Sequence, residues 1–270
     1  MDDRYRPLEY WSELLASDFT LRGTGHVSYS RGYNEWMYRR KAKVLGRALG
    51  AISRRRNLFS PPLAEPSSKD QVLEPRALDV GSGTGWVVEQ LLAWGAVVEG
   101  SDLTAVSVSR LTERFPDVVF FRFALGSSAV PRAEGTYELV TLMDVAYHVT
   151  DDELWQAGIV ELARVIAPGG FLVATDCFGV AERDPAAHVR FRSMESWASA
   201  TEPHGLRLTI LLPLYRWLSR DLDELRFPDM PHRLRGMLEY VLETIAPRKA
   251  HLSLAVFQKA QDPTRTAATG

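Results

Sequence analysis

A glycine-rich segment followed by a single acid is the part of this sequence best suited to chemistry. The run Arg76-Ala-Leu-Asp-Val-Gly-Ser-Gly-Thr-Gly85 joins a short apolar stretch to three alternating glycines, and Asp102 follows a second apolar stretch. Glycines allow a tight turn between a strand and a helix, and they let a ligand approach the backbone. An acid at the end of the next strand can bind the hydroxyls of a ribose. The pattern predicts a site for an adenosine-type cofactor.

The spacing of the glycines favours one kind of cofactor. The dinucleotide fingerprint is G-x-G-x-x-G, whereas this chain has G-x-G-x-G with Trp86 in the sixth position. An indole does not suit the close packing that the third glycine permits beside a pyrophosphate. Asp79 lies just before the turn, and its charge would repel a phosphate. A cofactor with a cationic amino-acid end and no phosphate fits better, and S-adenosylmethionine answers that description.

Three segments together resemble a known family. Leu78-Asp-Val-Gly-Ser-Gly-Thr-Gly85 is similar to the first motif of the class I S-adenosylmethionine-dependent methyltransferases. Residues 137–148 resemble the fourth strand and following loop of that family, and residues 161–175 resemble its helix, Pro-Gly-Gly turn and fifth strand. The resemblance covers residues 74–180. It implies an α/β, Rossmann-like methyltransferase fold with a mostly parallel seven-stranded sheet and an antiparallel last strand. It also implies an enzyme that converts S-adenosylmethionine to S-adenosylhomocysteine.

The resemblance implies roles for residues around the glycine turn. Asp79 would support the turn and reach the ammonium group of the cofactor, directly or through water. Asp102 would bind the ribose hydroxyls, and Leu103 would pack against the adenine. The backbone contacts to the methionine part would come from Gly81, Ser82 and Gly83.

Other cofactor contacts are expected from further along the sheet and from the N-terminal region. Met143 or Asp144 would close the methionine side. Tyr38 or Arg39 would pair with the cofactor carboxylate, the alternative for Arg39 being a solvated helix charge.

The adenine contact departs from the family pattern. Members of the family often carry an acid after the third strand, but residues 118–126 contain none. We therefore expect backbone groups near Ala124 and Leu125, or a side chain from elsewhere, to contact the adenine.

Methyl transfer needs alignment of the acceptor with the methyl group at about 3 Å and removal of the acceptor's proton. Histidine is the usual base near neutral pH. His148 follows the predicted fourth strand, so it is a candidate general base, with a cofactor-shell role as the alternative. His26, in a polar glycine-containing loop, is a second candidate. Asp144 and Asp176 lack a third clustered ligand, so no metal site is predicted.

The chain divides by composition into a core and its additions. We expect a helical N-terminal cap over residues 1–49, a linker over 50–75, a cofactor-binding core over 76–260 and a flexible tail over 261–270. Apolar runs predict strands near 77–80, 96–100, 118–123, 138–143, 170–175, 206–212 and 252–257. A capping box at residues 150–153 predicts a helix that buries Leu154 and Trp155.

Two aromatic-rich additions are expected to cover the site. The bare core would leave the methyl group open to water, so residues 20–40 and a helical insertion at 213–247 are predicted to lie over the carboxyl ends of the strands. Rings in both segments suit an aromatic or sugar-like acceptor, although packing of the cap is the alternative role for each ring.

Composition limits the partners. The net charge of −2 indicates no global bias toward nucleic acid, and no apolar run is long enough to span a membrane. The single cysteine, Cys177, and the acidic N-terminus suit a cytoplasmic protein. The expected partner is a small-molecule acceptor, with no nucleic acid and no membrane, and a homodimer is left open.

The favoured function is methylation of a small molecule at a hydroxyl oxygen, with a secondary metabolite or a sugar as the acceptor. Methylation at nitrogen or carbon, and a non-catalytic binding or scaffold subunit, are the alternatives. A nicotinamide-dependent oxidoreductase is disfavoured by the missing third glycine. A nucleic-acid acceptor would rest only on basic runs such as Arg54-Arg-Arg56.

Overall fold

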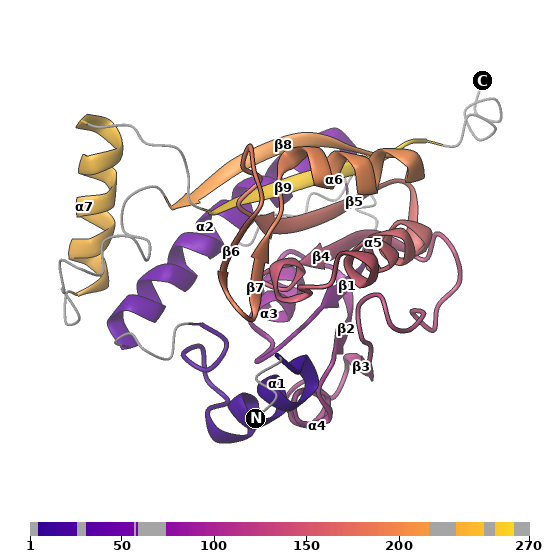
Figure 1. Ribbon diagram of the computed structural model, residues 1–270, viewed down its shortest axis with the longest axis horizontal. Coiled ribbons are helices and arrows are strands. Elements are labelled where there is room, and N and C mark those ends of the chain that lie inside the picture. The colour runs from indigo at the N-terminus through magenta and orange to yellow at the C-terminus, as the bar shows by residue number, and fades with distance from the viewer. Residues whose placement is uncertain are drawn as a thin grey trace, which may run out of the picture.

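A seven-stranded sheet forms the centre of the molecule (Figure 1). The computed structural model describes residues 5–25, 31–56, 58, 74–215, 231–245 and 252–261. The strand order is β3-β2-β1-β4-β5-β9-β8. The strands are β1 (Arg76–Val80), β2 (Val97–Asp102), β3 (Val119–Arg122), β4 (Tyr137–Leu142), β5 (Ile166–Asp176), β8 (Leu206–Tyr215) and β9 (Leu252–Lys259). The five neighbouring strands β3, β2, β1, β4 and β5 pair in parallel, whereas β9 is antiparallel to both of its neighbours, β5 and β8. The predicted fold is confirmed.

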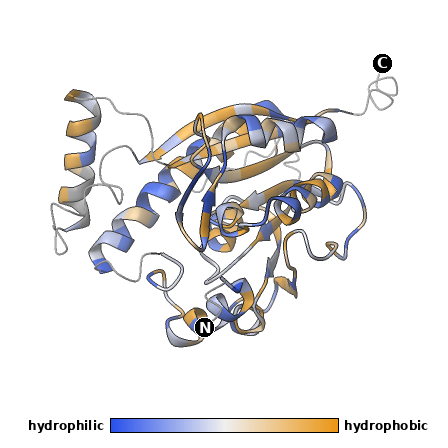
Figure 2. Cartoon of the chain, in the orientation of Figure 1, coloured by the Kyte–Doolittle hydropathy of each residue, from blue (hydrophilic) through white to orange (hydrophobic). Residues whose placement is uncertain are grey.

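The sheet is buried on both faces, which explains why its strands are apolar runs without polar alternation. Leu139 and Phe171 point to one face, and the next residues, Val140 and Leu172, point to the other; all four are fully buried. The hydropathy colouring shows the same concentration of hydrophobic residues in the central strands (Figure 2). Helices α2 and α3 cover the first face, and α5 and α6 cover the second.

The helices are α1 (Pro7–Ser17), α2 (Arg31–Arg56), α3 (Trp86–Ala93), α4 (Ala105–Arg114), α5 (Asp152–Val165), α6 (Met194–Thr201) and α7 (His232–Ile245), with single 3₁₀ turns η1 (Ala146–His148) and η2 (Glu202–His204). The predicted capping box is one residue out of place. Asp151, not Thr150, caps α5, because its carboxylate accepts a hydrogen bond from the Leu154 amide at 2.9 Å. Leu154, which was predicted to be buried, is 40% exposed. In the described parts of the chain, no helix is both long and apolar enough to cross a membrane.

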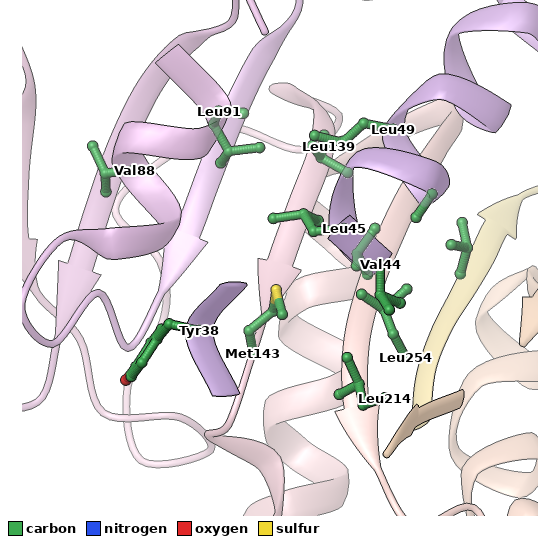
Figure 3. Packing of buried hydrophobic residues seen from close by; sticks show 14 of the residues in the cluster. Tyr38, Val44, Leu45, Leu49, Val88, Leu91, Leu139, Met143, Leu214 and Leu254 are labelled. Atoms are coloured by element: carbon green, nitrogen blue, oxygen red, sulfur yellow. The ribbon is translucent and has the colours of Figure 1, made fainter. Parts of the chain in front are cut away.

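Helix α2 fixes the N-terminal region on the sheet. Its apolar side packs against β4 and β9, with Leu45 and Leu49 beside Leu139 and Leu254 (Figure 3). The helix continues to Arg56, so the predicted boundary at residue 49 lies inside a helix. Basic residues in its last turn suit the negative end of the helix dipole. The expected tail and most of the expected linker lie outside the described residues, and the division into cap, linker and core stays a prediction.

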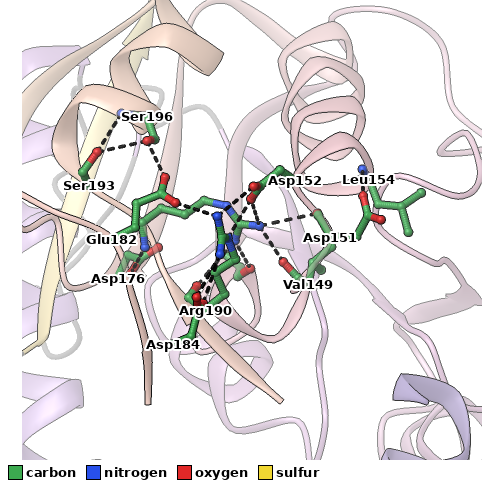
Figure 4. A network of polar contacts seen from close by, with 12 residues as sticks. Val149, Asp151, Asp152, Leu154, Asp176, Glu182, Asp184, Arg190, Ser193 and Ser196 are labelled. Atoms are coloured by element: carbon green, nitrogen blue, oxygen red, sulfur yellow. Dashed lines mark hydrogen bonds and ion pairs between the residues drawn. The ribbon is translucent and has the colours of Figure 1, made fainter. Parts of the chain in front are cut away.

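The structure contains a small β-hairpin that was not predicted from the sequence. Strands β6 (Arg183–Ala186) and β7 (Val189–Phe191) form a separate two-stranded sheet. Arg190 and Arg192 tie this hairpin to α5, because both guanidinium groups bond the Asp152 carboxylate, at 2.8 and 3.0 Å (Figure 4). Arg190 also pairs with Asp184 at 3.0 Å. These ion pairs position the hairpin loop, which contains His188, beside the carboxyl end of β4.

Candidate active site

A cavity of about 500 Å³ lies at the carboxyl ends of β1, β2 and β4, where open parallel sheets usually bind ligands. Three groups of residues form its walls: the glycine turn, the ends of the next strands, and the N-terminal elements. The cavity-lining residues that the sequence predicted are Tyr38, Gly81, Ser82, Gly83, Asp102, Leu103, Ala124, Leu125, Met143, Asp144 and His148. The predicted residues at strand ends therefore meet in one place.

The backbone amides of the glycine turn are used inside the protein. The amides of Gly81 and Ser82 both donate to the Ser101 carbonyl, at 2.8 and 2.9 Å. The Gly83 amide donates to Asp102 Oδ2 at 2.9 Å. A pyrophosphate site needs amides that point at the ligand. This turn is therefore built for a ligand that donates hydrogen bonds or carries positive charge.

Two positions in the turn require glycine. Gly81 has φ +74°, and a Cβ there would lie 2.3 Å from Cγ2 of Val145. Gly83 has φ +52°, and its Cβ would lie 2.9 Å from Cγ2 of Thr24. The missing side chains let Val145 and Thr24 approach the backbone of the turn closely.

Asp102 presents a fixed carboxylate at the cavity wall. The side chain is only 6% exposed, and its Oδ1 accepts hydrogen bonds from the amide and hydroxyl of Thr104 at 2.8 and 2.9 Å. Burial raises the pKa of Asp102, and these hydrogen bonds oppose that rise. The Asp102 carboxylate is thus placed where it could accept hydrogen bonds from the two hydroxyls of a diol in the cavity.

Asp79 lies beneath the cavity floor and does not line it. Its Oδ1 accepts a hydrogen bond from the Thr141 hydroxyl at 2.7 Å, whereas its buried Oδ2 has no hydrogen-bond partner among the described residues. Burial raises the pKa of Asp79 to about 6, although the hydrogen bonds of Thr141 and Ser82 lower it. An unpaired buried carboxylate oxygen under the glycine turn fits a cationic ligand above it, reached through the turn or a water molecule.

Replacement of Asp79 by asparagine should change how stability depends on pH. The folded chain binds the Asp79 proton more tightly than the unfolded chain, so this stabilisation is present near pH 4 and is lost as the pH rises through about 6. Between about pH 4.5 and 7.5, we expect the wild type to lose roughly 2 kcal/mol relative to Asp79→Asn. Urea unfolding at both pH values measures this difference. Parallel pH profiles would show that Asp79 ionises as freely in the folded state as in the unfolded state.

The adenine end of the cavity contains a side chain that the sequence analysis missed. The amide of Ala124 donates to the Ser128 hydroxyl at 3.2 Å, and its carbonyl accepts from the Ser127 amide at 3.0 Å. Both the amide and the carbonyl of Ala124 are therefore hydrogen-bonded within the turn that contains Ser127 and Ser128. Leu125 and Ser127 line the cavity beside it, which makes the Ser127 hydroxyl a candidate for the adenine contact.

The two residues of α2 that were predicted to bind the cofactor carboxylate differ in position. Tyr38 is buried and lines the cavity, and its hydroxyl lies 2.9 Å from the Thr24 hydroxyl. Arg39 is exposed and does not line the cavity, which favours the alternative of a solvated helix charge. The basic residue that points inward is Lys41, which forms an ion pair with Asp144. Asp144 therefore already has a cationic partner.

His148 lies on η1 and lines the cavity. Its Nδ1 is 2.8 Å from the backbone carbonyl of His188. Because a carbonyl only accepts, Nδ1 carries the proton and Nε2 is the basic nitrogen of the neutral ring. The two imidazole rings are stacked, with centroids 5.7 Å apart. The other candidate base, His26, lies outside the described residues.

Helix α1 closes the acceptor side of the cavity. Trp11 contacts His148 edge to face at 4.9 Å, and its indole donates a hydrogen bond to the Tyr5 hydroxyl at 3.0 Å. The other end of α1 is held by Arg110, which donates to the Leu15 carbonyl at 3.3 Å. The spacing of Trp11 and Leu15 could have predicted a helix, but nothing local predicts where it docks. The α1 residues that line the cavity are Pro7, Leu8, Trp11 and Leu15, with Tyr5 just before the helix.

The helical insertion at residues 213–247 was predicted to lie over the carboxyl ends of the strands, but its described part does not lie there. Helix α7 packs against α2, at the left edge of the molecule in Figure 1, and contributes no residue to the cavity. Residues 216–230 and 246–247 of the predicted insertion lie outside the described residues.

Comparisons with known proteins agree with this geometry. Residues 78–174 match the family model described as a methyltransferase domain. The chain is 37% identical over 101 residues to a ubiquinone biosynthesis O-methyltransferase from Burkholderia ambifaria, covering 36% of this chain and 42% of that protein. It is 30% identical over 148 residues to the 2-methyl-6-phytyl-1,4-hydroquinone methyltransferase of a Synechocystis species, covering 48% and 45%. The chain thus spans less than half of these curated relatives.

A solved structure extends the similarity over nearly the whole chain. The N-methyltransferase NodS from Bradyrhizobium japonicum, solved with S-adenosylhomocysteine, superposes with a TM-score of 0.56 at 13% identity. The alignment covers 93% of this chain and 98% of that one. At this identity the match concerns the fold.

Proposed function

We propose that this chain, whose residues 78–174 match a methyltransferase domain, is a class I S-adenosylmethionine-dependent methyltransferase that methylates a hydroxyl oxygen on a small, ring-containing acceptor. The observation that carries this proposal is the glycine turn. Its first amides are bonded within the protein, and the orphaned Asp79 oxygen lies below it. This arrangement disfavours a phosphate and favours a cationic amino-acid group.

The residues present suit S-adenosylmethionine, which supplies an electrophilic methyl group when bound. Asp102 would accept hydrogen bonds from the ribose hydroxyls, and Leu103 and Leu125 would pack on the adenine. The glycine turn and Asp79 would hold the ammonium end, and Met143 would close the methionine side. The tasks of the chain are then to align the acceptor, to exclude water and to take up one proton.

The acceptor side of the cavity suits an apolar ring. Leu8 and Trp11 of α1 line the cavity, and Trp11, which contacts the His148 ring, offers an aromatic surface for stacking. One curated relative is named an O-methyltransferase of ubiquinone biosynthesis, and the other is named for a hydroquinone, a ring with two hydroxyl groups. This likeness supports a phenol or hydroquinone hydroxyl as the methylated group.

His148 is the proposed general base. The His188 carbonyl fixes the tautomer that leaves Nε2 basic, and the ring lies at the wall where the acceptor would be placed. Nε2 would take the hydroxyl proton as the acceptor oxygen forms its bond to the methyl carbon. His26 stays a prediction as a second base.

Calorimetric titration with S-adenosylmethionine, S-adenosylhomocysteine and NAD tests the proposal. We expect micromolar binding of the first two ligands and no binding of NAD. Subsequent assays with catechol, aniline and C–H acceptors of similar shape would distinguish oxygen, nitrogen and carbon methylation. Binding without transfer to any acceptor would favour a non-catalytic subunit, and failure of both sulfur ligands to bind would overturn the proposal. A cytoplasmic location, a homodimer and the lack of a nucleic-acid partner stay predictions from the sequence.

A further inference from the structure

A buried ion pair links α2 to the wall of the cavity. Lys41 is only 3% exposed, and its ammonium group pairs with Asp144 Oδ2 and lies 4.6 Å from the ring centroid of Tyr38. Burial opposes a charge on either partner. Nevertheless, Asp144 keeps the pKa of Lys41 raised, and Lys41 keeps the pKa of Asp144 below its usual value. Both groups are therefore charged.

The carboxylate of this pair is fixed at the cavity. Asp144 lines the cavity two residues after the end of β4, and its φ of +60° places it in the left-handed region. Its Oδ1 accepts hydrogen bonds from the hydroxyls of Tyr147 and Thr175, at 3.0 and 3.2 Å. Lys41 is the only cationic side chain that contacts Asp144 among the described residues. Without Lys41, the negative charge of Asp144 at the cavity wall would be compensated only by hydrogen bonds from the Tyr147 and Thr175 hydroxyls.

We propose that Lys41 neutralises Asp144 so that the cavity does not favour the cationic reactant over its neutral product. This inference rests on the proposed function and concerns the charge on sulfur. In the proposed methyl transfer the acceptor oxygen would form a bond to the methyl carbon as the carbon–sulfur bond breaks, so that the electron pair of that bond would stay on sulfur and the positive charge of the sulfonium would be lost. An uncompensated carboxylate would stabilise the sulfonium more than the transition state, which lowers the rate. Lys41 acts through Asp144 and is a positioning residue.

The affinities for S-adenosylmethionine and S-adenosylhomocysteine measure this effect, because the two ligands differ in the methyl group and the charge on sulfur. We would titrate each into the wild type, Lys41→Met and Lys41→Met/Asp144→Asn at about pH 8, where a carboxylate is ionised. Lys41→Met should shift the preference about tenfold toward S-adenosylmethionine, as expected for a charge several ångströms away at intermediate dielectric. The double variant should return the preference to that of the wild type.

Two further variants and a control separate the effect of charge from an effect on folding. Asp144→Asn should shift the preference toward S-adenosylhomocysteine, and this variant provides the opposite sign if Lys41→Met does not fold. Lys41→Arg keeps the charge and should keep the wild-type preference. Lys43→Met, an exposed lysine on the same helix, should leave both affinities unchanged. Thermal melting of each variant separates loss of folding from loss of preference.

Two results would contradict different parts of the argument. Equal weakening of both ligands in Lys41→Met would overturn the charge-balance inference, since it would indicate contact with the shared amino-acid part or a purely structural role. Failure of the wild type to bind either ligand would instead overturn the proposed function on which the inference rests. A tenfold shift that the double variant abolishes would establish the inference.

Discussion

Replacing His148 by alanine is expected to lower kcat by roughly 100- to 10,000-fold, the usual contribution of a general base. The ring lines the cavity, and its hydrogen bond to the His188 carbonyl makes Nε2 the basic nitrogen. The affinity for S-adenosylmethionine should change little, because the expected cofactor contacts come from the glycine turn and Asp102. Steady-state kinetics with an accepted substrate, together with calorimetry for the cofactor, measure both quantities.

Two companion variants separate the chemistry of His148 from its packing. His148→Gln keeps a polar side chain of similar size but cannot serve as the base, so it should be as slow as the alanine variant. His188→Ala removes the stacked ring and keeps the backbone carbonyl, so its fall in kcat should be far smaller. A fall in cofactor affinity with an unchanged kcat in His148→Ala would instead place this residue in the cofactor shell.

Replacing Asp102 by alanine is expected to weaken binding of S-adenosylmethionine and S-adenosylhomocysteine by the same factor, about 100-fold or more. Two hydrogen bonds from the ribose to a charged acceptor would be lost, and each contributes about 1.5 kcal/mol at the lower end of its range. Asp102 also accepts the hydrogen bond of the Gly83 amide, so part of the loss would come from a loosened turn. Calorimetry with each ligand provides the measurement.

A comparison with an exposed acid makes the Asp102 experiment specific. Asp117→Ala removes a surface carboxylate beyond α4 and should leave both affinities unchanged. Thermal melting without ligand shows whether the Asp102→Ala protein is folded. Unaltered affinity in a folded Asp102→Ala protein would mean that the ribose is bound elsewhere.

Most of the sheet could be predicted because its signals are local. The apolar runs and the glycine or Pro-Gly-Gly turns between them fix the parallel strands in order, and parallel strands bring their carboxyl ends to one edge. For that reason the sequence could place Gly81, Asp102, Met143 and His148 together although they are far apart in the chain, and all four line one cavity. The closing antiparallel strand followed from the family resemblance.

The contributions of the N-terminal elements could not be predicted, because they depend on how helices dock. The run Arg39-Arg-Lys41 has three consecutive cations, and its pattern alone does not show which one points inward. The orientation of α2 on the sheet buries Lys41 and exposes Arg39. Helix α1 likewise reaches the cavity through ring contacts of Trp11 with His148, a pairing between distant segments. The β6–β7 hairpin was missed because charged residues, held by ion pairs, replace the usual strand pattern.

The ion pairs of the β6–β7 hairpin have a consequence for ionic strength. Asp152 and Asp184 are half exposed or more, so dissolved salt screens their attraction to Arg190, whereas the buried guanidinium of Arg192 is shielded from it. The same hairpin presents the His188 carbonyl that selects the tautomer of His148. Given the proposed role of His148 as the base, we expect added salt to alter its proton uptake through the hairpin, and to affect less the strand ends proposed to hold the cofactor.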